Sequence, residues 1–170
     1  MKENILIVCW GNIQRSPTAA YILNKKLESY NLDTKYEATS RGIQGSGKIK
    51  KPRFVQFSGY VEEYAAALPI LKKYNINLDS HVSTPISESD VENAKIVLAM
   101  DRRVLNDPEG GLLQQFPHYK EKIYLFTSLI GQEEDIQDPI TIKDKEKYEE
   151  IIGEIDAVIE QGFPRLRSLL

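Results

Sequence analysis

The sequence has a single cysteine, Cys9, among its 170 residues. One cysteine rules out an intramolecular disulfide, and with it the small secreted scaffolds that depend on disulfides for stability. Histidine is also scarce: His81 and His118 are the only two, and neither lies in a cluster with Cys9 at metal-ligand spacing. We therefore expect no metal site and no cofactor.

Long apolar runs and a strong charge imbalance are absent as well. No stretch approaches the roughly 20 apolar residues that span a bilayer, and the apolar run at 5–9 is too short for the core of a signal peptide. A formal net charge of -3 gives no reason to expect nucleic acid or an anionic membrane as a partner. We expect a cytoplasmic protein of one domain that binds neither nucleic acid nor membrane.

Short β-rich runs alternate with longer helical patterns along the chain. Strands are predicted at 5–9, 35–39, 94–100 and 122–126. Helices are predicted at 16–30, at 61–74, where Pro69 is expected to break or shorten the helix, and from Tyr148 to an end marked by Gly162 and Pro164. Strands separated by helices indicate βαβ units, so we expect an α/β fold, a single three-layer domain with a parallel sheet flanked by helices.

Residues 9–18, CWGNIQRSPT, lie between the first predicted strand and the first predicted helix. Cys9 is at the carboxyl end of that strand, the edge at which ligands bind on parallel sheets. A loop that leads into a helix points several backbone N–H groups at one spot, where the helix dipole also favours an anion. Arg15 follows Cys9 after five residues and offers two parallel donors to phosphoryl oxygens. The pattern favours a phosphate site with Cys9 as the nucleophile.

The thiolate, not the thiol, is the nucleophilic form of cysteine. The loop N–H groups and Arg15 are expected to favour the thiolate of Cys9. Ser16 is placed to donate a hydrogen bond to the sulfur, which would help it to leave in a second chemical step. The residues expected to form the phosphate-binding loop are Trp10, Gly11, Asn12, Ile13, Gln14 and Ser16.

Residues 8–20, VCWGNIQRSPTAA, resemble the signature of the low-molecular-weight protein-tyrosine phosphatases. The resemblance continues through SHVS at 80–83, VLAMDRRVL at 97–105 and QDPI at 137–140, and so covers nearly the whole chain. It implies a domain over 1–170 with a four-stranded parallel sheet and a phosphate-binding loop after the first strand. It also implies phosphotyrosine-containing proteins or peptides as substrates, a phosphocysteine intermediate on Cys9, and inorganic phosphate as product and inhibitor.

The resemblance assigns further roles by position. Asp138, in an Asp-Pro pair before the final helix, matches the general acid that protonates the leaving oxygen and then activates water as a base. Asn12 matches an asparagine that keeps the strained loop in shape, and His81 matches a histidine that supports Asn12. The family also has a supporting serine after its second strand. The candidates for it here are Glu37, Thr39 and Ser40, and Ser40 is included in the predicted site.

Two departures from the family pattern concern the surroundings of Cys9. Most relatives have a second cysteine directly before the arginine, whereas this chain has Gln14, so oxidised Cys9 is expected to lack that protection. Ile140 and Thr141 follow the Asp-Pro pair, where the family commonly has aromatic residues. Trp10 is expected to supply one wall of the substrate cleft.

Segment 45–59 is predicted to be an insertion or long loop near the active site. It has a basic cluster. Two aromatic residues of the segment, Phe54 and Phe57, and Tyr60 directly after it are candidates for a second wall of the substrate cleft. We hypothesise that its lysines attract acidic phosphopeptides.

Several alternatives to a tyrosine phosphatase exist. Arginine phosphatases share this fold and loop but have threonine at the position of Ile13, so the isoleucine favours phosphotyrosine. Thioredoxin-coupled arsenate reductases relay oxidation through further cysteines, which this chain lacks. A non-catalytic phosphoprotein-binding module would be expected to have lost one of Cys9, Arg15 and Asp138, and all three are present.

Overall fold

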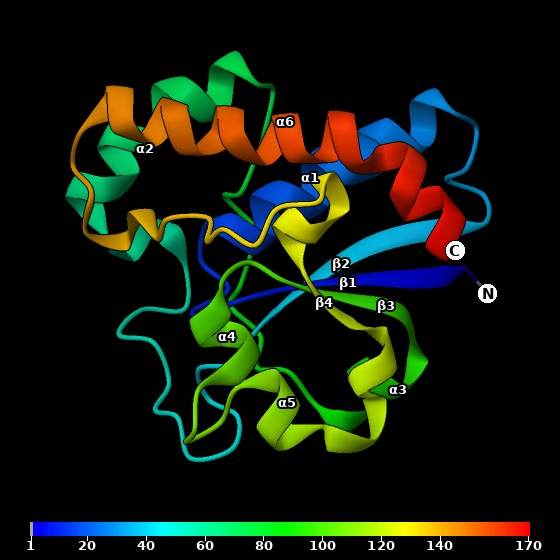
Figure 1. Cartoon of the computed structure of the whole chain (residues 1–170). Helices are drawn as coiled ribbons and strands as arrows, with labels where there is room; N and C mark the ends of the chain where they lie inside the picture. The colour runs from blue at the N-terminus through cyan, green and yellow to red at the C-terminus, as the bar shows by residue number, and fades with distance from the viewer. Residues whose placement is uncertain (1) are drawn as a thin grey trace.

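The computed structural model describes residues 2–170 and contains one parallel sheet with helices on both of its faces (Figure 1). The strands lie in the order β2-β1-β3-β4, and every neighbouring pair is parallel. Their bounds are β1 Glu3–Cys9, β2 Tyr36–Gly42, β3 Ala94–Ala99 and β4 Ile123–Leu125. The predicted α/β class, the four strands and their parallel pairing are confirmed, with strand bounds shifted by a few residues.

The alternation of side chains along β1 explains why helices cover both faces. Ile5 and Ile7 are buried against one set of helices, and Leu6 and Val8 against another, because successive strand residues point to opposite faces. The first set is α1 (Arg15–Ser29) and α6 (Lys145–Leu169). The second set, on the opposite face in Figure 1, is α3 (Glu88–Asn93), α4 (Arg102–Asn106) and α5 (Leu112–Gln115).

A third apolar cluster joins α2 (Val61–Lys73) to α6. Short 3₁₀ segments complete the chain, namely η1 Phe57–Gly59, η2 Pro117–Lys122, η3 Phe126–Ile130 and η4 Pro139–Thr141. No helix within residues 2–170 is long and apolar enough to cross a membrane.

The helices predicted at 61–74 and near the C-terminus are present, but the effects expected of Pro69, Gly162 and Pro164 are wrong. The exposed Pro69 does not break α2, which continues to Lys73. Gly162 and Pro164 do not end α6 either, since the helix continues to Leu169. Gly162 is buried, and a Cβ there would lie 2.6 Å from the Cβ of Leu129. This glycine therefore permits close packing between α6 and η3 and does not cap the helix.

Candidate active site

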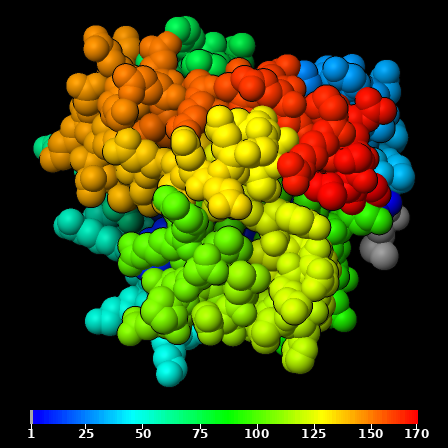
Figure 2. Space-filling view, viewed as in Figure 1, coloured from blue at the N-terminus to red at the C-terminus, as the bar shows by residue number. Residues whose placement is uncertain are grey.

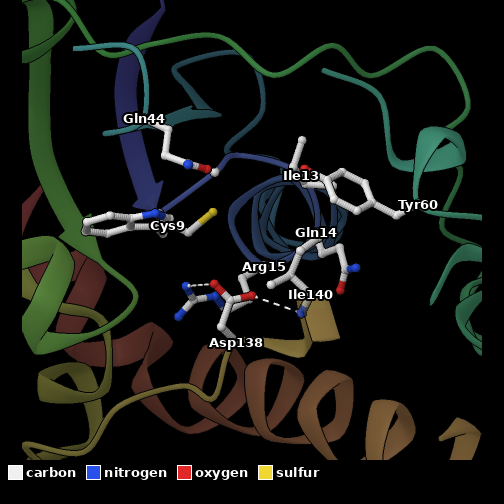
Figure 3. Close-up of a pocket in the computed structure, with 10 residues that line it drawn as sticks. Cys9, Ile13, Gln14, Arg15, Gln44, Tyr60, Asp138 and Ile140 are labelled. Carbon is white, nitrogen blue, oxygen red and sulfur yellow. Dashed lines mark hydrogen bonds and ion pairs between the residues drawn. The ribbon is translucent and has the colours of Figure 1, made fainter. Parts of the chain in front are cut away.

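Cys9 ends β1, and the loop after it curls back over the sulfur before α1 begins at Arg15. The sulfur accepts two hydrogen bonds, from the backbone N–H of Asn12 at 3.1 Å and from the hydroxyl of Ser16 at 3.1 Å. Figure 2 shows a hollow on this side of the molecule, with blue atoms of the N-terminal part at its floor, between the green region of α4 and the yellow-orange segment before α6. The pocket residues drawn in Figure 3 are Cys9, Trp10, Gly11, Ile13, Gln14, Arg15, Gln44, Tyr60, Asp138 and Ile140.

Asn12 holds the shape of the loop. Its backbone is left-handed, with φ at 53°, a conformation that is rare outside glycine but tolerated by asparagine. The side-chain amide donates to Ser16 Oγ at 3.0 Å and to Ser40 Oγ at 2.9 Å, and its oxygen accepts from the N–H of Thr84 at 3.0 Å. His81 Nε2 lies 2.7 Å from the carbonyl oxygen of Asn12. Ser40, not Glu37 or Thr39, is thus the polar residue of β2 that contacts the loop asparagine.

The tautomer of His81 follows from its surroundings. Burial lowers the pKa of this histidine, which favours the neutral ring. Because a carbonyl oxygen only accepts, the neutral ring donates its Nε2–H to Asn12. His81 therefore supports the strained residue of the loop as an uncharged donor.

Two further contacts of the loop were not foreseen from the sequence. Ser83 donates its hydroxyl to the carbonyl oxygen of Gly11 at 2.6 Å. Gly42, at the end of β2, lies against the loop so closely that a Cβ would sit 2.9 Å from the Gly11 carbonyl carbon and 3.0 Å from the Asn12 nitrogen. Any larger residue at Gly42 would have to displace the backbone of the loop.

Arg15 is buried and lies between two carboxylates. Its Nη1 donates to Asp101 and, at 2.7 Å, to the carbonyl oxygen of Ile136, and its Nη2 donates to Asp138 at 2.7 Å. Burial lowers the pKa of the guanidinium, but Asp138, Cys9 and Asp101 together outweigh burial and raise it. Arg15 is therefore a fixed positive charge beside the sulfur.

The thiol of Cys9 does not have the depressed pKa expected from the sequence. Burial raises the pKa of Cys9, and this effect is larger than the lowering by Arg15 and by the Ser16 hydroxyl. Asp138 raises it further. The difference has a physical cause: burial takes more solvation from the thiolate than Arg15 and the Ser16 hydroxyl compensate.

The walls of the pocket are mostly apolar. Trp10, Tyr60 and Ile140 line it, together with Ile13 at the entry to α1. The guanidinium carbon of Arg103 lies 3.3 Å from the centre of the Trp10 ring, on which it stacks. Of the three aromatic residues proposed for the second wall, only Tyr60 lines the pocket. Phe57 is buried in the cluster between α2 and α6, and Phe54 is exposed at the surface.

Gln14 is the one polar side chain of the loop with no hydrogen bond for either of its terminal atoms within residues 2–170. Its relative exposure is 3%, although it borders the pocket. An amide in an apolar wall costs free energy unless something pairs with it.

Known proteins identify the family to which these features belong. A model of the low molecular weight phosphotyrosine protein phosphatase family matches residues 4–168. The chain belongs to this family. It is 29% identical over 126 residues to the low molecular weight protein-tyrosine-phosphatase Wzb of Escherichia coli K12, covering 74% of this chain and 71% of that protein. It is also 24% identical over 166 residues to the protein-arginine-phosphatase of Bacillus subtilis, covering 97% of both chains.

A crystal structure of the low molecular weight protein tyrosine phosphatase from T. tengcongensis has the same fold. It aligns with this phosphatase at a TM-score of 0.75 and 28% identity, covering 96% of this chain and 99% of that one. The resemblance recognised from the sequence motifs is thereby confirmed, as is the fold that it implies.

The residues that sequence reasoning selected lie together in this phosphatase. Cys9, Arg15 and Asp138 border one pocket, and Ser40 and His81 contact Asn12 from outside it. Asp101 was missed, although it pairs with Arg15. A signal for it existed: Asp101 comes almost directly after a buried strand, at the same carboxyl edge of the sheet as Cys9.

Proposed function

We propose that the protein hydrolyses phosphotyrosine in proteins or peptides through a phosphocysteine intermediate on Cys9. The observation that supports this most is the arrangement of three groups around one pocket. A sulfur with two hydrogen-bond donors lies at its floor, and Arg15 and Asp138 lie at its side. A phosphoryl group placed over the sulfur would meet a nucleophile, a cation and a proton donor together.

In the first step the Cys9 thiolate attacks phosphorus, and the bond from phosphorus to the tyrosine oxygen breaks. Asp138 gives its proton to that oxygen, because a phenolate is a poor leaving group unless it is protonated as it departs. In the second step water attacks the phosphocysteine and passes a proton to Asp138. The S–P bond breaks, the sulfur takes the electron pair, and inorganic phosphate is released.

The contacts of the sulfur suit this second step. The Asn12 N–H and the Ser16 hydroxyl point at Sγ and can stabilise the thiolate as it leaves. Burial alone disfavours that thiolate, so these two donors and Arg15 carry the stabilisation.

Arg15 is proposed to exchange one of its carboxylate partners for the phosphoryl oxygens. The side chain of Asp138 is 39% exposed, whereas that of Asp101 is 13% exposed. Asp138 also borders the pocket, and Asp101 does not. Asp138 is therefore the partner that gives way, while Asp101 keeps the guanidinium oriented.

Tyrosine is favoured over arginine as the phosphorylated residue because of the pocket walls. An aromatic ring can bury its faces against Trp10, Ile13, Tyr60 and Ile140. A guanidinium in the same place would leave N–H groups facing apolar side chains, which costs free energy. Since relatives of both kinds resemble the chain, arginine phosphatase activity is the second candidate.

The test compares three substrates: p-nitrophenyl phosphate, a phosphotyrosine peptide and a phosphoarginine peptide. We expect turnover of the first two, inhibition by vanadate, and loss of turnover in Cys9→Ser. Asp138→Asn is expected to slow the phosphotyrosine peptide more than p-nitrophenyl phosphate, because p-nitrophenolate leaves without a proton. Absence of turnover near pH 6 would overturn the proposal.

The choice between tyrosine and arginine rests on Ile13. Ile13→Thr is expected to raise the ratio of phosphoarginine to phosphotyrosine kcat/KM. Phosphoarginine turnover that exceeds phosphotyrosine turnover in the unaltered protein would reverse the assignment. Ile22→Thr, the same substitution on α1 and outside the pocket, is the matched control.

A further inference from the structure

Most of the exposed large hydrophobic side chains lie in one place beside the pocket. Among residues 2–170 five such side chains are exposed, and all but Tyr30 lie on or next to the 45–59 segment. We name as the apolar patch the four residues Phe54, Val55, Val61 and Val82. Single exposed hydrophobic residues are ordinary, whereas a contiguous group of them indicates an interaction surface.

Contacts and adjacency in the chain bring the members of the apolar patch into one region. The N–H of Ser83 donates to the carbonyl oxygen of Val55 at 2.7 Å, which places the segment beside Val82. The ring of Phe54 meets the ring of Tyr60 edge-on, with centroids 5.2 Å apart, and Val61 follows Tyr60 in the chain. The patch is thus continuous with the pocket, because Tyr60 also lines the wall near Cys9.

The 45–59 segment is ordered by specific contacts. Gly59 allows Phe54 to lie against the backbone, since a Cβ there would be 2.7 Å from the Phe54 ring. Gln115 of α5 donates to the hydroxyl of Ser46 at 3.0 Å and so fastens the start of the segment to the helix layer. A surface that is already in place loses little conformational entropy when a partner binds.

The same segment has a concentration of positive charge. Its four cations are exposed, and none of them forms an ion pair with the described residues: Lys48, Lys50, Lys51 and Arg53. Asp107 and Glu109 share a hollow with Lys48 and Lys50, whereas Arg53 stacks on Phe54 of the patch. Positive charge therefore borders the apolar patch. In Figures 1 and 2 the cyan-to-teal segment projects at one side of the molecule.

We propose that the apolar patch and the cations of 45–59 form a docking surface for the acidic flank of a phosphorylated protein segment. The phosphotyrosine of that segment would enter the Cys9 pocket, so the inference rests on the proposed function. Charge complementarity identifies the flank as acidic, and the patch adds a preference for an apolar side chain within it. Continuity through Tyr60 places the flank directly beside the phosphorylated residue.

An anionic membrane would also match positive charge beside apolar side chains, but the rest of the chain argues against it. The segment has four positive and no negative residues, and the whole chain has a net charge of -3, so the remainder has a net charge of -7. The long-range field of that negative remainder opposes attraction of the whole protein to an anionic lipid surface, whereas a short peptide contacts the segment alone.

The test uses two phosphotyrosine peptides that differ only in an acidic or a basic flank, with p-nitrophenyl phosphate as the small substrate. The loop variant combines Lys50→Glu, Lys51→Glu and Arg53→Glu. The control variant makes the same change of charge at three exposed cations outside the segment, Lys25→Glu, Lys120→Glu and Arg165→Glu. A second loop variant, Val55→Ser with Val61→Ser, tests the apolar patch.

The loop variant is expected to lower kcat/KM for the acidic peptide by about tenfold and to leave p-nitrophenyl phosphate within twofold. The preference for the acidic over the basic peptide should weaken with added salt. The serine variant is expected to raise KM for both peptides by several-fold and to leave the small substrate unchanged. Equal effects in the loop and control variants, or an equal loss on all substrates, would overturn the proposal.

A binding measurement separates docking from catalysis. In Cys9→Ser, fluorescence anisotropy should show about tenfold tighter binding of the acidic than of the basic phosphopeptide, and the loop changes should remove this difference. Such binding without turnover in the unaltered protein would refute the catalytic proposal alone. Binding to phosphatidylserine vesicles that requires the loop cations, together with unchanged peptide binding, would assign the surface to membranes and overturn the inference.

Discussion

Replacing Gln14 with leucine is expected to stabilise the protein. The Gln14 side chain is 3% exposed, and neither its Oε1 nor its Nε2 has a hydrogen-bond partner within residues 2–170. It borders apolar wall residues of the pocket, among them Ile13 and Ile140. Leucine has a similar size and no polar atom, so the change removes the desolvated amide without opening a large cavity.

The size of the effect follows from the cost of a buried polar group without a partner. That cost is about 1–3 kcal/mol, and we expect Gln14→Leu to recover about this much free energy of unfolding. For a chain of this length 1 kcal/mol corresponds to roughly 2–4 °C in Tm. Urea unfolding at neutral pH would measure the change in the free energy of unfolding, and we expect the m value, its slope against urea concentration, to be the same in both proteins.

Gln44→Leu is the matched control, because Gln44 borders the same pocket but is only half-buried. We expect that control to change the free energy of unfolding by no more than about 0.5 kcal/mol. Destabilisation by Gln14→Leu would show that the amide is hydrogen-bonded in solution, and the reasoning would then be refuted. Equal stabilisation by both variants would show that any apolar replacement at the pocket stabilises the protein, whether or not the amide has a partner. That result would also refute the reasoning.

Three further predictions concern the loop, its histidine and its sulfur. Gly42→Ala is expected to lower kcat on the order of 10²-fold, because the added Cβ would displace the backbone of Gly11 and Asn12. The control is Gly153→Ala, whose Cβ would have Tyr74 Oη at 3.7 Å as its nearest contact and should leave kcat unchanged. Equal kcat in the two variants would contradict this prediction. The pKa of His81 is lowered by burial, so its neutral form stabilises the fold above the unfolded pKa of about 6.5, and that contribution is lost as the pH falls towards the lower folded pKa. His81→Gln should therefore lose less stability between pH 7 and pH 5 in urea titrations, and parallel curves would argue against it. Peroxide inactivation should be prevented by phosphate but poorly reversed by dithiothreitol, since Cys9 has no second cysteine to form a disulfide; full recovery after prolonged exposure would exclude this.

The sheet was predictable because its strands are short apolar runs between helical patterns. A fully buried parallel strand such as β3 is apolar almost throughout, and this is visible without tertiary information. The end of α6 was not predictable in the same way. A glycine followed by a proline normally ends a helix, but here Gly162 is needed for contact with Leu129 on a distant part of the chain. The local pattern predicted that α6 would end near Gly162, but packing between distant segments lets the helix continue.

The phosphate loop was predictable because its parts are adjacent in the sequence. Three of its residues that contact one another lie within seven positions in the sequence, namely Cys9, Asn12 and Ser16, so their spacing alone indicates these contacts. The pKa of Cys9 was not predictable from that spacing, because it depends first on how the whole fold buries the sulfur. Nor does that spacing show which carboxylates pair with Arg15. Those carboxylates come from segments about 90 and 120 residues further along the chain.

The two carboxylates that contact Arg15 have different surroundings, and this difference assigns different tasks to them. Asp101 uses Oδ1 to cap α4 at the N–H of Val104 and Oδ2 to hold Arg15, so both of its oxygens are occupied within the fold. Asp138 contacts Arg15 and the N–H of Ile140 from the wall of the pocket and is three times as exposed as Asp101. A carboxylate that must exchange protons with a leaving group and with water needs that exposure, while one that orients a buried cation does not. Asp138 is therefore suited to the proton transfer that the sequence resemblance assigned to it, and Asp101 to positioning, a task that only the three-dimensional arrangement reveals.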